Sequence, residues 1–301
     1  MQPHPVLKAG LWMLGTLLSF SVMAIAARQL SADFSTLQIL AIRSAIGLLV
    51  VSMMLTRSGW QQVRTRQPGT HLLRNLAHYL GQFGWFYAIG FIPLAAVFAI
   101  EFTVPLWTLL FAAALLGERI SLPRIIAVLL GIGGVLVILR PGAEVLHTAA
   151  VVMLGGAFAY GLSHTLTKRL APANTPLCIL FYMMAIQLPL GLVPAVFDWV
   201  TPGVTHWPWF LLVGLTGLSA HYCMVRALML ADASVVIPMD LLRLPLIALV
   251  GFVAYGETVD FYLAVGAGLI LLGNALNLLW DRQKTMDMRI EAQQDDSSAK
   301  Q

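Results

Sequence analysis

The chain has 301 residues, of which 59% are hydrophobic and only 11% are charged, and its mean hydropathy is +0.82. Soluble domains average about 25% charged residues, so this composition excludes a pair of water-soluble domains and indicates one integral membrane unit. The net charge of +4 comes from basic residues scattered between apolar runs, which excludes a clustered cationic face for nucleic acid.

Ten apolar runs are long enough to cross the hydrocarbon core of a bilayer, which takes about 20 residues in a helix. In chain order they are 8–29, 36–56, 71–90, 93–116, 122–140, 148–168, 177–197, 208–227, 233–255 and 259–280. Short connections rich in turn residues separate several of them, such as "APANTP" at 171–176. We therefore predict an all-α integral membrane protein of ten transmembrane helices, followed by a polar, solvated cytoplasmic tail at 281–301.

The first run has a second interpretation, as a cleaved signal peptide. Lys8 precedes it, and the small residues at 24–26 resemble a cleavage site. The apolar stretch from Ala9 to Ala27 is long for a signal peptide, and the internal repeat of the chain needs this helix. We therefore expect the first helix to be retained.

The distribution of lysine and arginine predicts the orientation in the membrane. With the N-terminus inside, fourteen of these residues fall on the cytoplasmic side: Lys8, Arg57, Arg64, Arg66, Arg74, Arg119, Arg124, Lys168, Arg169, Arg226, Arg282, Lys284, Arg289 and Lys300. Only Arg28 and Arg140 fall outside. By the positive-inside rule, both termini are expected in the cytoplasm, and we expect a location in a bacterial inner (plasma) membrane.

The chain also repeats itself. A displacement of 139 residues aligns Glu101 with Asp240 and Gly117–Glu118 with Gly256–Glu257. Each half holds five spans, and because five is odd, the two halves enter the membrane in opposite orientations. The predicted units are residues 8–140 and 148–280.

These features resemble the drug/metabolite transporter superfamily, specifically its EamA-type members. The resemblance rests on the duplicated five-helix units, on "LLGE" at 115–118 and "AYGE" at 254–257, and on the proline-containing "EFTVPLW" and "LLRLPLI" before them. It implies a secondary carrier that moves small organic solutes by alternating access, with a central cavity between two EamA-like repeats. One departure is visible: Pro105 lies 13 residues before Glu118, whereas Pro245 lies 12 before Glu257, so the two kinks are not symmetric.

Four ionisable residues stand out within the predicted spans: Arg43, Glu101, Asp240 and Arg243. An unpaired charge in hydrocarbon costs about 2.5–3.5 kcal/mol on insertion scales, so each should face a cavity or find a partner. Asp240 and Arg243 are three positions apart and can pair on one helical face, either as a structural brace or as a substrate site. Glu101 has no such neighbour, so it either pairs with Arg43 from another helix or holds a proton. Arg43 could instead extend to the outer surface.

Polar and aromatic residues recur at helical spacing on three other spans. The candidates are Asn75, His78, Tyr79, Gln82 and Trp85 on the third span, Tyr160 and His164 on the sixth, and His221 and Tyr222 on the eighth. Such stripes can line an aqueous cavity with stacking surfaces and hydrogen-bond donors, or they can join packed helices. We expect a substrate cavity along the third span, and for the other two spans helix joining explains the pattern at least as well.

The remaining polar and special residues suggest no metal or cofactor. The histidines lack ligand spacing, and Cys178 and Cys223 both lie in predicted spans, so neither a metal site nor a disulfide framework is indicated. Pro105, Pro238 and Pro245 act either as hinges or as ordinary membrane kinks. The glycines of the fifth and tenth spans are expected to allow close helix packing: Gly131, Gly133, Gly134, Gly266, Gly268 and Gly273.

Three classes of function remain. The leading one is a secondary transporter of a small metabolite or drug-like solute, coupled to protons through Glu101 or Asp240. An intramembrane enzyme or an ATP-driven pump is disfavoured, because no His-Glu-x-x-His, Gly-x-Ser-x-Gly or Walker motif is present. A channel or a membrane scaffold is the other alternative. Acidic and basic residues in one cavity would suit a zwitterion such as an amino acid.

Overall fold

The computed structural model describes residues 5–117, 122–139, 147–230, 239–240, 242–276 and 279–280. Within these ranges the regular structure is helical, without a strand. Several residues used in the sequence analysis lie outside them: Glu118, Arg119, Arg140, Pro238, Arg282, Lys284, Arg289, Lys300 and the rest of the tail at 281–301.

The described helices follow the predicted spans. The first half contains α1 (Pro5–Leu30), α2 (Thr36–Ser58), the 3₁₀ turn η1 (Trp60–Val63), α3 (Pro68–Phe91), α4 (Leu94–Glu101), α5 (Val104–Leu116) and α6 (Leu122–Leu139). The second half contains α7 (Thr148–Leu170), α8 (Pro176–Ala195), the turns η2 (Val196–Asp198) and η3 (Val204–His206), α9 (Trp207–Leu230), α11 (Arg243–Tyr255) and the helix Phe261–Leu276.

Five helical segments of the described chain are long and apolar enough by themselves to cross a membrane. They are Leu7–Leu30, Thr36–Ser58, Leu94–Leu116, Thr148–Leu170 and Pro176–Asp198. The helices α3 and α9 have the necessary length, 24 residues each, and carry two of the polar stripes noted in the sequence. Together with the shorter apolar helices, these segments form an all-α membrane protein of ten spans in two inverted five-helix repeats.

Equivalent turns recur in the two halves. Ser35 caps α2, because its hydroxyl accepts a hydrogen bond from the backbone N–H of Gln38 at 3.3 Å. Thr175, displaced by 140 residues, caps α8 by accepting from the N–H of Cys178 at 3.2 Å. A hydroxyl residue thus precedes the second span of each repeat, where it satisfies a backbone donor that the helix leaves free.

The C-terminal ends of α5 and α11 are equivalent in the same way. Each helix has 13 residues, and each ends at a glycine with a left-handed backbone conformation, Gly117 at φ 71° and Gly256 at φ 64°. Glycine adopts this conformation without the steric penalty of a Cβ atom. The "GE" pairs recognised in the sequence therefore mark helix ends.

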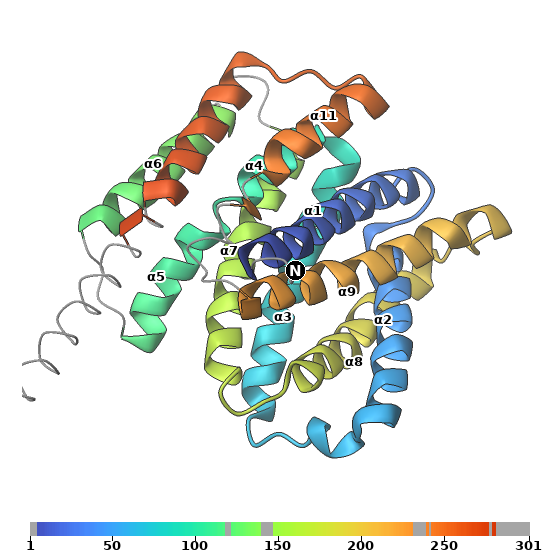
Figure 1. Ribbon diagram of the computed structural model, residues 1–301. Helices are drawn as coiled ribbons and strands as arrows, with labels where there is room; N and C mark the ends of the chain where they lie inside the picture. Colours follow the sequence, from blue (N-terminus) through green and yellow to red (C-terminus); the bar gives the residue numbers. More distant parts are fainter. Residues whose placement is uncertain are drawn as a thin grey trace, which may run out of the picture.

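The two repeats interlock. The helix α1 packs against α9, α3 packs against α7, and α2 packs against α8, so each of these pairs joins one repeat to the other (Figure 1). At the crossing of α3 and α7 the backbones approach closely, because Gly84 and Gly156 face each other. The interior surfaces shared by the two repeats therefore come from helices distant in sequence.

The predicted span at 93–116 is confirmed as one segment, Leu94–Leu116, but its helix is interrupted and forms α4 and α5. The break lies at Phe102 and Thr103, between α4 and α5. Pro105 has no N–H to donate to the carbonyl of Glu101, so the regular hydrogen-bond ladder cannot continue through this point. Instead, Thr103 donates both its N–H and its hydroxyl to the carbonyl of Ile100, at 3.0 and 2.7 Å.

The predicted close packing of helices is confirmed at some of the glycines of the fifth and tenth spans. A Cβ atom at Gly134 or Gly266 would meet the backbone carbonyl of the other glycine, at 2.5 and 2.6 Å, and one at Gly273 would meet the carbonyl of Ala127 at 2.7 Å. For Gly133 and Gly268 the expectation was wrong, since nothing in the described structure lies within 4 Å of such an atom.

Candidate functional site

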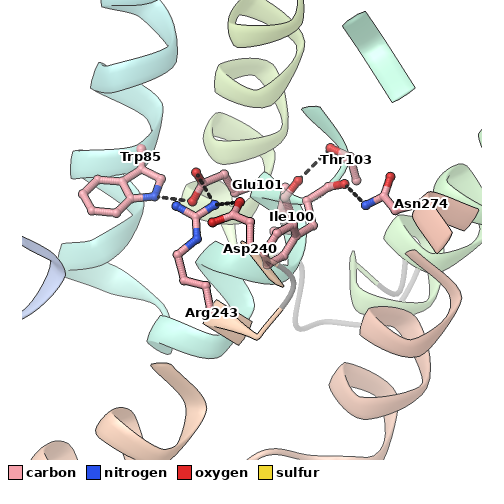
Figure 2. A network of polar contacts seen from close by, with 8 residues as sticks. Trp85, Ile100, Glu101, Thr103, Asp240, Arg243 and Asn274 are labelled. Carbon is pink, nitrogen blue, oxygen red and sulfur yellow. Dashed lines mark hydrogen bonds and ion pairs between the residues drawn. The ribbon is translucent and has the colours of Figure 1, made fainter. Parts of the chain in front are cut away.

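The two acids related by the repeat meet at one arginine. Nη2 of Arg243, at the first turn of α11, lies 3.3 Å from Oε1 of Glu101 and 3.3 Å from Oδ2 of Asp240 (Figure 2). Glu101 is the last residue of α4, immediately before the break. The end of α4 and the start of α11 thus bring two carboxylates and one guanidinium together inside the protein.

The surroundings of this cluster are aromatic. The indole N–H of Trp85 donates to Oε2 of Glu101 at 2.8 Å. The guanidinium of Arg243 lies over the rings of Phe20, Phe98 and Phe102, at 4.6, 5.2 and 5.2 Å from their centroids. These rings favour a cation electrostatically while excluding water. The expectation that Glu101 pairs with Arg43 was therefore wrong, because Arg243 holds both acids.

The break before α5 is supported from the tenth span, a feature that the sequence analysis missed. Nδ2 of Asn274 donates to the carbonyl of Phe102 at 2.7 Å (Figure 2). That carbonyl loses its helical partner at the break, because the N–H of Leu106 bonds to Thr103 instead. Irregular backbone at membrane depth needs such a partner. Asn274, one of two asparagines in a largely apolar span, was the available signal.

A cavity of about 240 Å³ adjoins the cluster. Eleven of the candidates from the sequence line it: Arg43, His78, Gln82, Trp85, Glu101, Pro105, Tyr160, His164, His221, Asp240 and Arg243. Its other lining residues are apolar: Phe20, Met23, Phe86, Phe102, Val104 and Met224. The cavity thus combines charged groups, neutral polar groups and aromatic faces, contributed by both repeats, which is typical of a site for an organic solute.

Four candidates lie elsewhere. Tyr222 is 52% exposed and packs edge-on against Trp12, so it lies on the outer side of α9 rather than in the cavity. Asn75 is fully buried and accepts a hydrogen bond from Arg74 at 2.7 Å. Tyr79 is buried in the hydrophobic core. Pro245 lies in the first turn of α11 but is not among the lining residues. For Asn75, Tyr79 and Tyr222 the proposed place in the cavity is therefore wrong.

Arg43 does not extend to the outer surface, since it is only 3% exposed. The amide of Gln82 satisfies its neighbours when its oxygen faces Arg43 and its nitrogen faces Gln187. In that orientation the oxygen accepts from Nη1 and Nη2 of Arg43 at 2.6 and 3.1 Å, and the nitrogen donates to Oε1 of Gln187 at 2.8 Å. Nε2 of Gln187 lies 3.0 Å from Nδ1 of His78. A chain of buried polar side chains, formed by Gln82, Gln187 and His78, therefore holds the guanidinium in place.

Gln187 and Arg74 are buried polar residues whose roles the sequence analysis missed. Arg74, counted above among the cytoplasmic charges, is 7% exposed and donates through Nε to the hydroxyl of Thr167 at 3.0 Å. The polar positions of α3 therefore serve two purposes, because some line the cavity and others connect α3 to α7 and α8.

A second ion pair lies at the end of α1. Nη2 of Arg28 is 3.0 Å from Oε1 of Glu257, and it also donates to the carbonyl of Ile92 at 2.6 Å. The other carboxylate oxygen of Glu257 accepts from the N–H of Leu94, the first residue of α4, at 2.8 Å. Glu257 is thus an acid at the N-terminus of α4, and its contacts join α1, α4 and the end of α11.

The sequence matches the family model described as the EamA-like transporter family twice, over residues 7–140 and 147–279. Among curated proteins, the chain is 30% identical over 287 residues to a riboflavin transporter of Vibrio cholerae, covering 94% of this chain and 96% of the relative. It is 22% identical to an S-adenosylmethionine uptake transporter of Rickettsia prowazekii, with the same coverage of both chains. It is 28% identical over 257 residues to a pseudopaline exporter of Pseudomonas aeruginosa.

A solved crystal structure with 22% sequence identity superposes with a TM-score of 0.62, covering 91% of this chain and 98% of the other, which shows the same fold. The twofold family match and the curated relatives confirm the resemblance drawn from the sequence. They indicate a membrane transporter of small molecules and not an enzyme. The chain belongs to the EamA-like transporter family.

Proposed function

We propose that this protein is a secondary active transporter that moves a small organic metabolite by alternating access and is driven by protons. The observation that carries the proposal is the cluster of Glu101, Asp240 and Arg243 beside the cavity. It joins α4 of the first repeat to α11 of the second, so rearrangement of one repeat against the other would change its contacts.

The charges of the cluster support a role for protons. Two carboxylates share one guanidinium, so one negative charge is left over when both acids are ionised. A proton on Glu101 would remove that charge and weaken the hold of Arg243 on α4. The other charged or titratable groups that line the same cavity are Arg43 from α2, His78 from α3, Tyr160 and His164 from α7, and His221 from α9.

The substrate we propose contains an aromatic or heteroaromatic ring. Trp85, Phe86 and Phe102 present aromatic surface to the cavity, and Tyr160 does so from the opposite repeat. The names of two relatives, riboflavin transporter and S-adenosylmethionine uptake transporter, both refer to metabolites with a fused heteroaromatic ring system. At sequence identities of 30% and 22%, the solute of this chain can differ from those of the two relatives.

Transport by purified protein in sealed vesicles tests the proposal. We expect a proton gradient to drive accumulation of riboflavin or S-adenosylmethionine, and we expect substrate counterflow, which a channel or scaffold does not show. In Glu101→Gln, gradient-driven accumulation should fall by about 10-fold or more while counterflow remains, because a glutamine cannot carry the coupling proton.

The matched control is Asp33→Asn, an acid-to-amide change at an exposed carboxylate that pairs with His206 at 3.5 Å outside the cavity. We expect it to behave like the wild type. A Glu101→Gln protein with full gradient-driven accumulation would eliminate Glu101 as the coupling carboxylate, and an absence of counterflow for every metabolite tried would count against a carrier.

The orientation that we propose places both termini in the cytoplasm of a bacterial inner membrane. It is supported by the excess of lysine and arginine in alternate loops and by the bacterial sources of the relatives. We place the boundaries of the two repeats at residues 8–140 and 148–280, which the recurring caps at Ser35 and Thr175 support.

A further inference from the structure

Arg43 differs from the other buried cation of the cavity, because it has no acidic partner among the described residues. Arg243 contacts two carboxylates, whereas no described carboxylate forms an ion pair with Arg43. The hydrogen-bond acceptor that the structure provides for Arg43 is one neutral amide oxygen, on Gln82, which accepts from both Nη1 and Nη2. A buried guanidinium with only neutral partners carries a substantial desolvation cost.

The guanidinium also keeps unused donor capacity. Its Nε is buried without a hydrogen-bond partner, although the side chain lines the cavity and is only 3% exposed. The side of the guanidinium that carries Nη2 and Nε faces Gly217 of α9, where a Cβ atom would lie 3.0 Å from Nη2 and 3.4 Å from Nε. Glycine at position 217 therefore lets α9 pack directly against the guanidinium, which a larger side chain would contact.

The polar chain behind Arg43 gives it a fixed orientation. The Gln82 oxygen accepts from Arg43, the Gln82 nitrogen donates to Gln187, and the Gln187 nitrogen is left to donate to Nδ1 of His78. Each amide is thereby held by its neighbour, so the planar guanidinium does not need to be ordered when a ligand arrives. Such pre-organisation lowers the entropic cost of binding.

From these contacts we infer that Arg43 is the binding site for an anionic group of the transported solute, a carboxylate or a phosphate. Both groups match the fork of N–H donors on a guanidinium and form charge-assisted hydrogen bonds with it. The inference deepens the proposed transport function and rests on it. It divides the cavity into a positive end at Arg43, which takes the anion, and a cluster around Arg243 that already satisfies its own charges.

Two pairs of compounds, alike except for the anionic group, test the inference with purified full-length protein. They are S-adenosylmethionine with its decarboxylated form, and riboflavin 5′-phosphate with riboflavin. We expect the anionic member of at least one pair to raise the apparent melting temperature and to bind about 10- to 100-fold more tightly than its partner. Arg43→Gln should remove that preference, so that the two members of a pair bind with similar affinity.

Gly217→Ala supplies a second variant in case Arg43→Gln does not fold. Its methyl group would approach Nη2 of Arg43, so we expect it to weaken binding of the anionic member selectively, by several-fold. Gly10→Ala is the matched control, because no described atom lies within 4 Å of a Cβ atom at Gly10.

Equal binding of both members of each pair, no stabilisation by either anionic member, or an unchanged preference in Arg43→Gln and Gly217→Ala would each overturn the anion site. The proposed transport function is judged separately, by counterflow of the same four compounds with the wild-type protein. If the compounds without the anionic group are carried as well as the others, transport stands and the anion site does not.

Discussion

At the scale of single residues, the central feature is that two buried arginines of the cavity have different partners. Arg243 is enclosed by three aromatic rings and shared by two acids, so its charge is compensated within the protein. Arg43 is held by a neutral amide and left without a described acidic partner. A buried charge that has an oppositely charged partner is compensated within the fold, whereas a buried charge without such a partner is available to a ligand.

Replacing Arg243 by glutamine should be strongly destabilising. Glu101 and Asp240 would then be two carboxylates without their shared cation, at a cost in unfolding free energy of about 3–5 kcal/mol. Adding Glu101→Gln to this variant removes one of the two negative charges and should recover part of the loss. Unfolding in detergent, followed for the wild type, both single variants and the double variant, measures the coupling. Additive effects would show that Arg243 and Glu101 do not interact energetically.

At the scale of elements, two structural features shape the interior: a close crossing of helices and a break within a helix. The crossing of α3 and α7 depends on glycine, because a Cβ atom at Gly84 would lie 2.8 Å from the carbonyl oxygen of Val152 and 3.0 Å from Cα of Gly156. This crossing sets the distance between Trp85 and Tyr160, which line the cavity from the two repeats. The break between α4 and α5 directs Glu101 toward Arg243.

Gly84→Ala should therefore destabilise the protein by about 1–3 kcal/mol, because the added methyl group meets backbone atoms that cannot rotate away. Gly155→Ala, on the facing helix, is the matched control: no described atom lies within 4 Å of its Cβ position, and we expect a change below about 0.5 kcal/mol. Thermal unfolding of the two variants in the same detergent makes the comparison. Equal stability of the two would show that α3 and α7 are not held at this distance.

At the scale of the whole molecule, the two repeats are interlocked rather than placed side by side, since α1 packs on α9 and α3 on α7 (Figure 1). The cavity consequently has walls from both repeats. An odd number of spans in each repeat makes the two halves inverted copies, and a carrier needs such paired conformations to open to either side.

The proposed orientation predicts which sites are accessible from outside the cell. In a protein with Cys178→Ser and Cys223→Ser, an impermeant thiol reagent should label Thr201→Cys, in the exposed loop between α8 and α9, in intact cells. Ser297→Cys, in the tail, should react only after the inner membrane is permeabilised. The reverse pattern of labelling would show the opposite topology, and labelling of both positions in intact cells would contradict the three spans predicted between them.

The sequence by itself determined the spans, the duplication and the equivalence of Glu101 and Asp240 in the two repeats. Hydropathy acts along the chain, because each run of about 20 residues must satisfy its own backbone in the membrane, and a repeat is visible without any fold. Most of the cavity-lining residues were also identifiable, because polar side chains are rare at this depth.

Only the tertiary structure decided which partner each polar residue takes. Glu101 meets Arg243 rather than Arg43, although the two are far apart in sequence, because α4 and α11 pack together. Tyr222 and His221 are neighbours in the chain, yet only His221 lines the cavity. The rotation of each helix about its axis and the distances between helices are set by packing between the repeats, which periodicity along one helix does not specify.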